Sequence, residues 1–207
     1  MLEKTCNNFI NELASQAPVP GGGSASALTA AIGTALGSMV GELTTGKKEY
    51  EAYETEISEL LFKSGELINE FKDLVQKDVD AFNILSKAYK FPKNTEEEKV
   101  VRTEAIQSAL KEAAITPIMI AEACVKALKL LDSYSLIGNK NLITDAGTGT
   151  ALCAAALKGA RLNALINLKS MKDEDLKARL YDQLNALTDT GIHLADITYE
   201  RVEKACF

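Results

Sequence analysis

The stretch EYEAYETEISELLFKSGELINEFKDLVQKDVDAFNILSKAYK, residues 49–90, decides the fold class. Apolar residues recur along it in alternating steps of four and three, which is the period of a helix face packed against other helices. The stretch therefore predicts one long helix with a buried seam. That seam consists of Tyr53, Ile57, Leu60, Ser64, Leu67, Phe71, Leu74, Asp78, Ala81 and Leu85.

Helical patterns also precede this stretch. Residues 6–14 predict a short helix behind Thr5, which can act as its cap. Two prolines and three glycines then predict an irregular loop over 18–24, where the backbone can come close to another group. From 26 to about 44 nearly every residue is small or apolar, which is typical of a buried central helix. Glycines spaced four apart in this helix indicate close helix packing, and they are Gly33, Gly37 and Gly41.

Three further elements follow the long helix. Thr95 and Glu98 have the spacing of a capping box and open a helix that ends near residue 131, with a kink or a break expected at Thr116-Pro117. After an irregular stretch, a fifth helix starts at Asp145 and runs to about residue 169. Asp173 can cap the last helix, whose apolar seam is Leu176, Leu180, Leu184, Leu187, Gly191 and Leu194.

The composition agrees with an all-α fold. Aromatic residues make up 6% of the chain and Trp is absent, whereas sheets favour aromatic and β-branched residues. A chain of 207 residues can bury one core without disulfides or metal. We therefore expect a single domain over 1–207, an all-α bundle of long antiparallel helices around a central Ala/Gly-rich helix.

The charge excludes some partners. A net charge of -6 provides no basic surface for nucleic acid or for an anionic membrane. The first nine residues hold no apolar run behind basic residues, so we expect a cytoplasmic protein. Hydroxyl residues interrupt the apolar helix at 26–44, and its apolar part is too short to predict a membrane span.

The cysteines do not suggest a metal site. They form no C-x-x-C pair, and only His193 could join them in binding a metal. We expect no metal, and we expect the cysteines to behave as small buried hydrophobes. They are Cys6, Cys124, Cys153 and Cys206.

Asp78 stands out because it occupies a seam position where the pattern requires an apolar residue. Burying a carboxylate without a partner is costly, so it must be paired, solvated by a cleft or protonated. A raised pKa would let Asp78 exchange a proton near neutral pH. The alternative is a structural aspartate that pairs with a lysine or arginine and fixes the helix register.

Other polar residues allow two interpretations each. Asp145 can cap a helix or serve in a site. Asn163 and Asn167 lie four apart, one turn after Gly159, so they present an amide face that suits a heteroaromatic ring or pairs within the core.

Basic residues and the glycine loop give weaker signals. Lys47 and Lys48 could hold a carboxylate tail together with Arg102, or the lysines could simply favour a helix C-terminus. The triglycine loop lacks the spacing of phosphate-binding motifs and does not follow a strand, so nucleotide binding there is rejected.

Several segments together resemble the cyclodeaminase/cyclohydrolase family of folate enzymes. Asp78-Val79-Asp80-Ala81-Phe82 is similar to the family's D-x-[DE]-A-F segment, whose first acid is the family's proposed catalytic residue. The resemblance covers residues from about 6 to 171. The other similar segments are Pro20-Gly21-Gly22-Gly23-Ser24, Gly37-Ser38-Met39-Val40, Thr45-Gly46-Lys47-Lys48, Phe91-Pro92-Lys93-Asn94-Thr95 with Glu97, Glu98, Lys99 and Arg102, Gly138-Asn139 to Asp145, and Asn163 to Leu168.

The resemblance implies an all-α homodimer or larger assembly that acts on a tetrahydrofolate carrying a one-carbon group, with no cofactor. The expected reaction is cyclodeamination, in which N10 of 5-formiminotetrahydrofolate attacks the formimino carbon and ammonia leaves. Asp78 would move the proton. Asp145 is the other candidate for the catalytic site, where it would help to orient the pterin.

The same resemblance suggests the substrate contacts. Asn163 and Asn167 would orient the pterin, and Lys47, Lys48 or Arg102 would meet the glutamate tail. The remaining substrate-binding candidates are Gly21, Gly22, Gly23, Ser24, Asp80, Asn139 and Asn141.

Two other functions remain open. Stand-alone members of the family include methenyltetrahydrofolate cyclohydrolases, in which water opens the methenyl bridge to give 10-formyltetrahydrofolate. The segment Lys169-Ser170-Met171-Lys172-Asp173 is more similar to these proteins than to the bifunctional ones. The third possibility is a bundle that binds folate or partners without catalysis.

Overall fold

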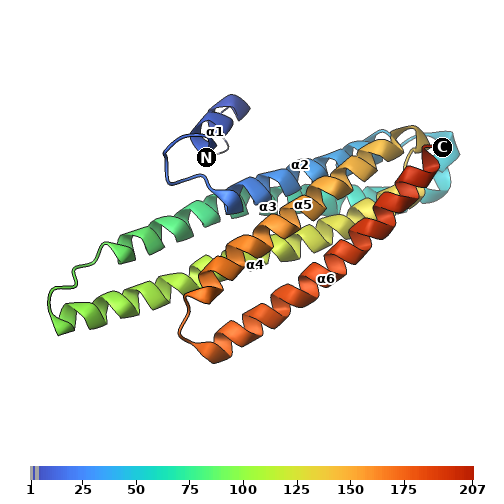
Figure 1. The fold of residues 1–207 in the computed structure, drawn as a ribbon. Coiled ribbons are helices and arrows are strands. Elements are labelled where there is room, and N and C mark those ends of the chain that lie inside the picture. Colours follow the sequence, from blue (N-terminus) through green and yellow to red (C-terminus); the bar gives the residue numbers. More distant parts are fainter. Residues whose placement is uncertain (1, 3–4) are drawn as a thin grey trace.

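The computed structural model describes residues 2 and 5–207, and helices joined by short loops make up this part of the chain (Figure 1). The described residues contain no strand, and the long helices run alternately in opposite directions, so the predicted all-α bundle is confirmed. The elements are α1 Cys6–Leu13, α2 Gly22–Glu42, the 3-10 helix η1 Lys48–Tyr53, α3 Glu54–Tyr89, α4 Glu96–Ile137, the 3-10 helix η2 Lys140–Leu142, α5 Ile143–Lys169 and α6 Glu174–Ala205.

Helix α2 packs against α3, α4 and α5, while Ile32 and Met39 on its outer face are exposed. Its glycines let the backbones approach closely, because a Cβ at Gly33 would lie 2.7 Å from the carbonyl oxygen of Gly149 on α5. By length and composition α2 is sufficient to span a membrane, contrary to the expectation that its apolar part is too short. More than half of the relevant window, 56%, is buried inside the bundle, which is the property of a core helix.

The buried seam of α3 is confirmed along almost its full length. Ile57, Phe71 and Leu85 are buried, as are the other apolar members of the seam. Tyr53 is exposed, because it ends the 3-10 helix that precedes α3 instead of belonging to α3 itself.

Two helix starts differ from the prediction. The loop before α2 ends at Gly21, so Gly22, Gly23 and Ser24 form the first turn of α2. Helix α5 begins at Ile143, and Leu142 is its N-terminal cap, so the predicted cap at Asp145 is wrong and this residue lies in the first turn.

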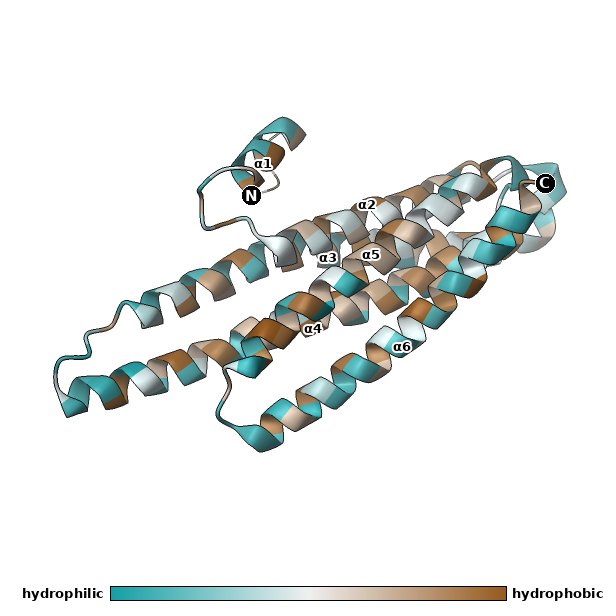
Figure 2. Ribbon diagram, in the orientation of Figure 1, coloured by the Kyte–Doolittle hydropathy of each residue, from teal (hydrophilic) through white to brown (hydrophobic). Residues whose placement is uncertain are grey.

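Helix α4 continues through Pro117 to Ile137 without a break. The predicted end near residue 131 is therefore six residues too early. The capping box of Thr95 and Glu98 is confirmed, and so is the cap of α6 at Asp173. Figure 2 shows hydrophobic residues along α4 and α5 and hydrophilic ones along much of α6.

The cysteines divide into two classes. Cys124 and Cys153 are buried, as expected, and burial raises the pKa of both thiols. Cys6 and Cys206 are exposed, so the prediction of buried cysteines is wrong for these two, which lie near the ends of the chain.

Candidate active site

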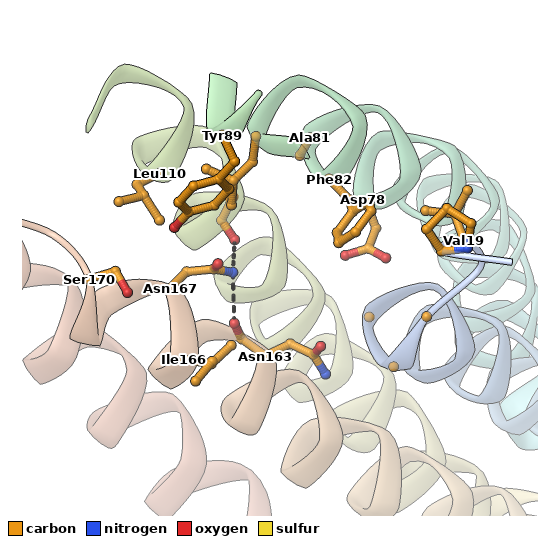
Figure 3. Close-up of a pocket in the computed structure, with 16 residues that line it drawn as sticks. Val19, Asp78, Ala81, Phe82, Tyr89, Leu110, Asn163, Ile166, Asn167 and Ser170 are labelled. Atoms are coloured by element: carbon orange, nitrogen blue, oxygen red, sulfur yellow. Dashed lines mark hydrogen bonds between the residues drawn. The ribbon is translucent and has the colours of Figure 1, made fainter. Parts of the chain in front are cut away.

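A cavity of about 380 Å³ lies where the start of α2 meets α3, α4 and the end of α5 (Figure 3). Its volume is within the range of small-molecule sites. The glycine loop forms one side, and the residues around it are Pro18, Val19, Gly21, Gly22, Gly23, Asp78, Ala81, Phe82, Leu85, Tyr89, Leu110, Ala113, Asn163, Ile166, Asn167 and Ser170.

Asp78 projects into this cavity from α3 (Figure 3). Two donors of Ser24 hold one of its oxygens: the hydroxyl group lies 2.7 Å from Oδ2, and the backbone N–H nitrogen lies 2.8 Å from the same atom. Since the donors belong to the first turn of α2, the carboxylate also sits at a helix N-terminus, which favours negative charge. No lysine or arginine of the described residues pairs with Asp78, so the alternative of a register-fixing ion pair is not what the structure shows.

Gly23 makes the space for this carboxylate. A Cβ at this position would lie 2.1 Å from Oδ1 of Asp78 and 2.6 Å from its Cγ. No side chain larger than hydrogen therefore fits while Asp78 keeps its place. The glycine loop serves the acid directly, rather than a phosphate.

Burial raises the pKa of Asp78 above its ordinary value, and the hydrogen bonds from the hydroxyl and the N–H of Ser24 partly offset this increase. A carboxyl group with a raised pKa exchanges protons more readily near neutral pH. The position of Asp78 in the cavity and its environment thus suit general acid/base chemistry.

Asn163 and Asn167 lie on α5 across the cavity from Asp78 (Figure 3). Nδ2 of Asn163 donates to the carbonyl of Gly159 at 2.8 Å, one helical turn earlier. Nδ2 of Asn167 donates to the carbonyl of Asn163 at 2.9 Å and to that of Ala113 on α4 at 2.7 Å. The predicted amide face is therefore present, and each amide is oriented by backbone carbonyls.

Arg102 lies beside Tyr89, one of the residues that line the cavity. Its Nη2 donates to the carbonyl oxygen of Tyr89 at 3.2 Å, and its guanidinium lies 6.0 Å from the centre of the Tyr89 ring. Because Tyr89 lines the cavity, a positive charge stands beside its rim.

Five predicted residues lie at the other end of the bundle within one chain. Asp145 is separated from Asn163 by 18 residues of α5, which correspond to about 27 Å. Helix α2 similarly separates the exposed lysines from Gly22 by about 30 Å. The residues of this distant group are Lys47, Lys48, Asn139, Asn141 and Asp145.

Asn139 of this distant group and Asp80 have structural partners. The amide of Asn139 accepts from the N–H of Asn141 and donates to the carbonyl of Leu43, so it organises the turn before α5. Asp80 is exposed and accepts from Gln76, and it does not line the cavity.

Sequence reasoning placed Ala81 and Leu85 in the apolar seam but did not identify Phe82 and Ile166 as walls of a cavity. Phe82 follows Asp78 by one helical turn, and Ile166 lies between the two asparagines. Both are exposed large hydrophobic side chains, at 42% and 62%. The signal in the sequence was their spacing, because Phe82 lies four residues after Asp78 and Ile166 lies three residues after Asn163.

A partly buried acid and two oriented amides around a cavity are the arrangement of a small-molecule site suited to general acid/base chemistry. The comparisons with known proteins then identify the family. The model of the formiminotransferase-cyclodeaminase family matches residues 5–186, and the chain belongs to this family of folate one-carbon enzymes.

The individual relatives are named for two different activities. A methenyltetrahydrofolate cyclohydrolase of Methylorubrum extorquens is 38% identical over 97% of this chain and 96% of its own length. The formimidoyltransferase-cyclodeaminase of Sus scrofa is 32% identical over 98% of this chain, which spans 38% of that protein. The crystal structure of a formiminotetrahydrofolate cyclodeaminase from Thermotoga maritima superposes with a TM-score of 0.85 at 31% identity, and the match covers 99% of this chain and 97% of the other.

Proposed function

We propose that this chain hydrolyses 5,10-methenyltetrahydrofolate to 10-formyltetrahydrofolate and that Asp78 moves the protons. The observation that carries the proposal is the Asp78 carboxyl group in the cavity, held by Ser24 and without a basic partner among the described residues. The cyclohydrolase relative supports this reaction, since it matches nearly the full length of both chains.

The reaction can proceed with one acid. Water adds to the bridging carbon of the methenyl cation while the ionised Asp78 accepts one of the water protons. Asp78 then delivers that proton to N5 as the bond between the carbon and N5 breaks. The second water proton is lost when the formyl group forms on N10, so one water is consumed and one proton is released.

The other residues of the cavity supply binding. Asn163 and Asn167 face the position where the pterin would lie opposite Asp78. Arg102 at the rim offers a positive charge to the glutamate tail. Phe82 and Ile166 provide apolar walls, as ligand cavities usually do.

Cyclodeamination of 5-formiminotetrahydrofolate is the second candidate. It is supported by the Thermotoga maritima structure, which superposes along nearly the whole chain. Here Asp78 would accept the proton of N10 as this nitrogen attacks the carbon of the protonated formimino group. Asp78 would then deliver that proton to the NH₂ group, which leaves as ammonia and gives the methenyl cation.

One assay separates these reactions. The purified protein is incubated with methenyltetrahydrofolate and, separately, with formiminotetrahydrofolate, while the methenyl absorbance is followed. The proposal expects rapid loss of absorbance with the first substrate. A gain of absorbance with the second substrate and no loss with the first would establish the cyclodeaminase instead, and binding without turnover of either would establish a non-catalytic protein.

The proposed assembly is a homodimer formed through the outer faces of α2 and α5. These two helices pack side by side, and α2 has no charged residue from Gly22 to Gly41. Both expose large apolar side chains, over about 16 Å between Ile32 and Leu43 and over about 6 Å between Leu162 and Ile166. A contiguous apolar surface of this kind is typical of an interface. The exposed side chains are Ile32 and Met39 of α2, Leu43 at its C-terminal cap, and Leu162 and Ile166 of α5.

A two-fold axis across the middle of α2 would explain why some predicted site residues lie far from the Asp78 cavity within one chain. It would bring Lys47 and Lys48 of the partner subunit towards the Asp78 cavity, because the two copies of α2 would then run antiparallel. Ile32→Glu is expected to give a monomer with weaker folate binding. Phe62→Glu is the matched control on α3, since Phe62 is 69% exposed and lies outside this face. A wild-type protein that is monomeric and fully active would exclude this assembly.

A further inference from the structure

Pro117 lies in the middle of α4 and leaves one carbonyl without its usual partner. Proline has no N–H, so the carbonyl of the residue four positions earlier, Ala113, cannot receive the normal helical hydrogen bond. Nδ2 of Asn167, a residue of α5, donates to that carbonyl at 2.7 Å instead. The helix therefore continues past the proline with its free carbonyl satisfied from a neighbouring helix.

This bond fixes the orientation of the Asn167 amide. An asparagine NH₂ group has two hydrogens, and those of Asn167 go to the carbonyls of Ala113 and Asn163. Its oxygen, Oδ1, accepts no hydrogen bond from the described residues, and it is not among the buried side-chain atoms that lack a partner. Since Asn167 lines the cavity, its one free polar atom is an acceptor available to a ligand (Figure 3).

We propose that Pro117 is a positioning residue that makes Asn167 an acceptor only, and that Asn167 thereby selects the hydrogen-bond donor edge of a heterocycle. A ring N–H or an exocyclic amine of the ligand can donate to Oδ1. A ligand carbonyl would meet oxygen against oxygen at the same place. The identity of the ligand as a folate rests on the proposed function, whereas the orientation of the amide does not.

Pro117→Ala tests the proposal without removing any group that lines the cavity. It returns an N–H to the helix, which can bond the carbonyl of Ala113 and release the Asn167 amide to rotate. A helix-interior Pro→Ala change also favours the helix, so folding is not endangered. We expect KM for the folate to rise about fivefold, as for the loss of one neutral hydrogen bond, while kcat and its pH profile stay unchanged.

The control is the same substitution in an Asn167→Ala background. If Pro117 acts through Asn167, Pro117→Ala raises KM in the wild-type background and has no further effect in the Asn167→Ala protein. An unchanged KM in the single variant, or an equal rise in both backgrounds, would overturn the proposal.

Thermal unfolding tests the coupling between Pro117 and Asn167 without any substrate. Asn167→Ala leaves the carbonyl of Ala113 unpaired only when Pro117 is present, so it should lower Tm by about 3 °C more in the wild-type background than in Pro117→Ala. Equal losses of Tm in the two backgrounds would overturn the proposed coupling. If the wild-type protein turns over neither folate, the proposed function fails, and the coupling between Pro117 and Asn167 is decided by the unfolding measurement alone.

Discussion

Gly23→Ala should abolish most of the activity while leaving the fold intact. The added Cβ would lie 2.1 Å from Oδ1 of Asp78, whereas an ordinary contact begins at 3.4 Å. The carboxylate would therefore have to retreat by about 1.3 Å, the difference between these two distances. A catalytic group misplaced by about 1 Å can cost roughly 10²-fold in rate, so kcat should fall by about that factor.

The neighbouring glycine offers a matched control. At Gly21, no atom of the described residues lies within 4 Å of an added Cβ, and φ is -124°. Gly21 also lines the cavity, so Gly21→Ala should affect KM for the folate, but it leaves Asp78 in place and should therefore keep nearly full kcat. The assay is the methenyltetrahydrofolate reaction at saturating substrate, with circular dichroism and thermal unfolding to verify the fold. A Gly23→Ala protein that folds and keeps wild-type kcat would refute the idea that this glycine makes room for the acid.

Three other predictions concern charge. Ser24→Ala removes one donor to Asp78, so the pKa of Asp78 should rise further and the acid limb of the kcat profile should move to higher pH, whereas Ser24→Thr should leave it in place. Since burial raises the pKa of Asp78 above 3.8, wild-type stability should fall as pH rises from 3.8 through the folded-state pKa. Asp78→Asn should then be more stable than wild type to urea at pH 7, and this advantage should disappear below pH 3.8. Arg102→Gln should raise KM about tenfold, equivalent to ~1.4 kcal/mol, for a folate with a glutamate tail but not for a pterin without one.

The fold was predictable from the sequence because the helical period is strong and local. The seam of α3 follows from the spacing of residues such as Ile57 and Phe71, and the caps at Thr95 and Asp173 follow from short motifs. The continuous helix at Pro117 was not predictable, because the group that satisfies the free carbonyl of Ala113 lies 54 residues away from it.

The candidate site was predictable only in part. Asp78 could be found because a carboxylate interrupts an apolar seam. The loop could be found from its prolines and glycines, but its predicted end was three residues too late, since α2 begins at Gly22. That Ser24 donates to Asp78 and that Gly23 makes room for it was not predictable, since Ser24 lies 54 positions from Asp78 in the chain. The order of motifs in the sequence likewise does not tell how far apart they lie along the bundle. Lys47 and Asp145 therefore could not be separated from the residues around Asp78, although they lie at the opposite end of the same chain.

The central claim is that the carboxyl group of Asp78 transfers the protons of a folate reaction. The most direct measurement compares kcat of wild type and Asp78→Asn on methenyltetrahydrofolate, with folate binding measured for both proteins. We expect the variant to bind folate and to lose about 10²- to 10⁴-fold in kcat, the usual contribution of a general acid/base. A folded Asp78→Asn protein that turns over the substrate at the wild-type rate would contradict the claim.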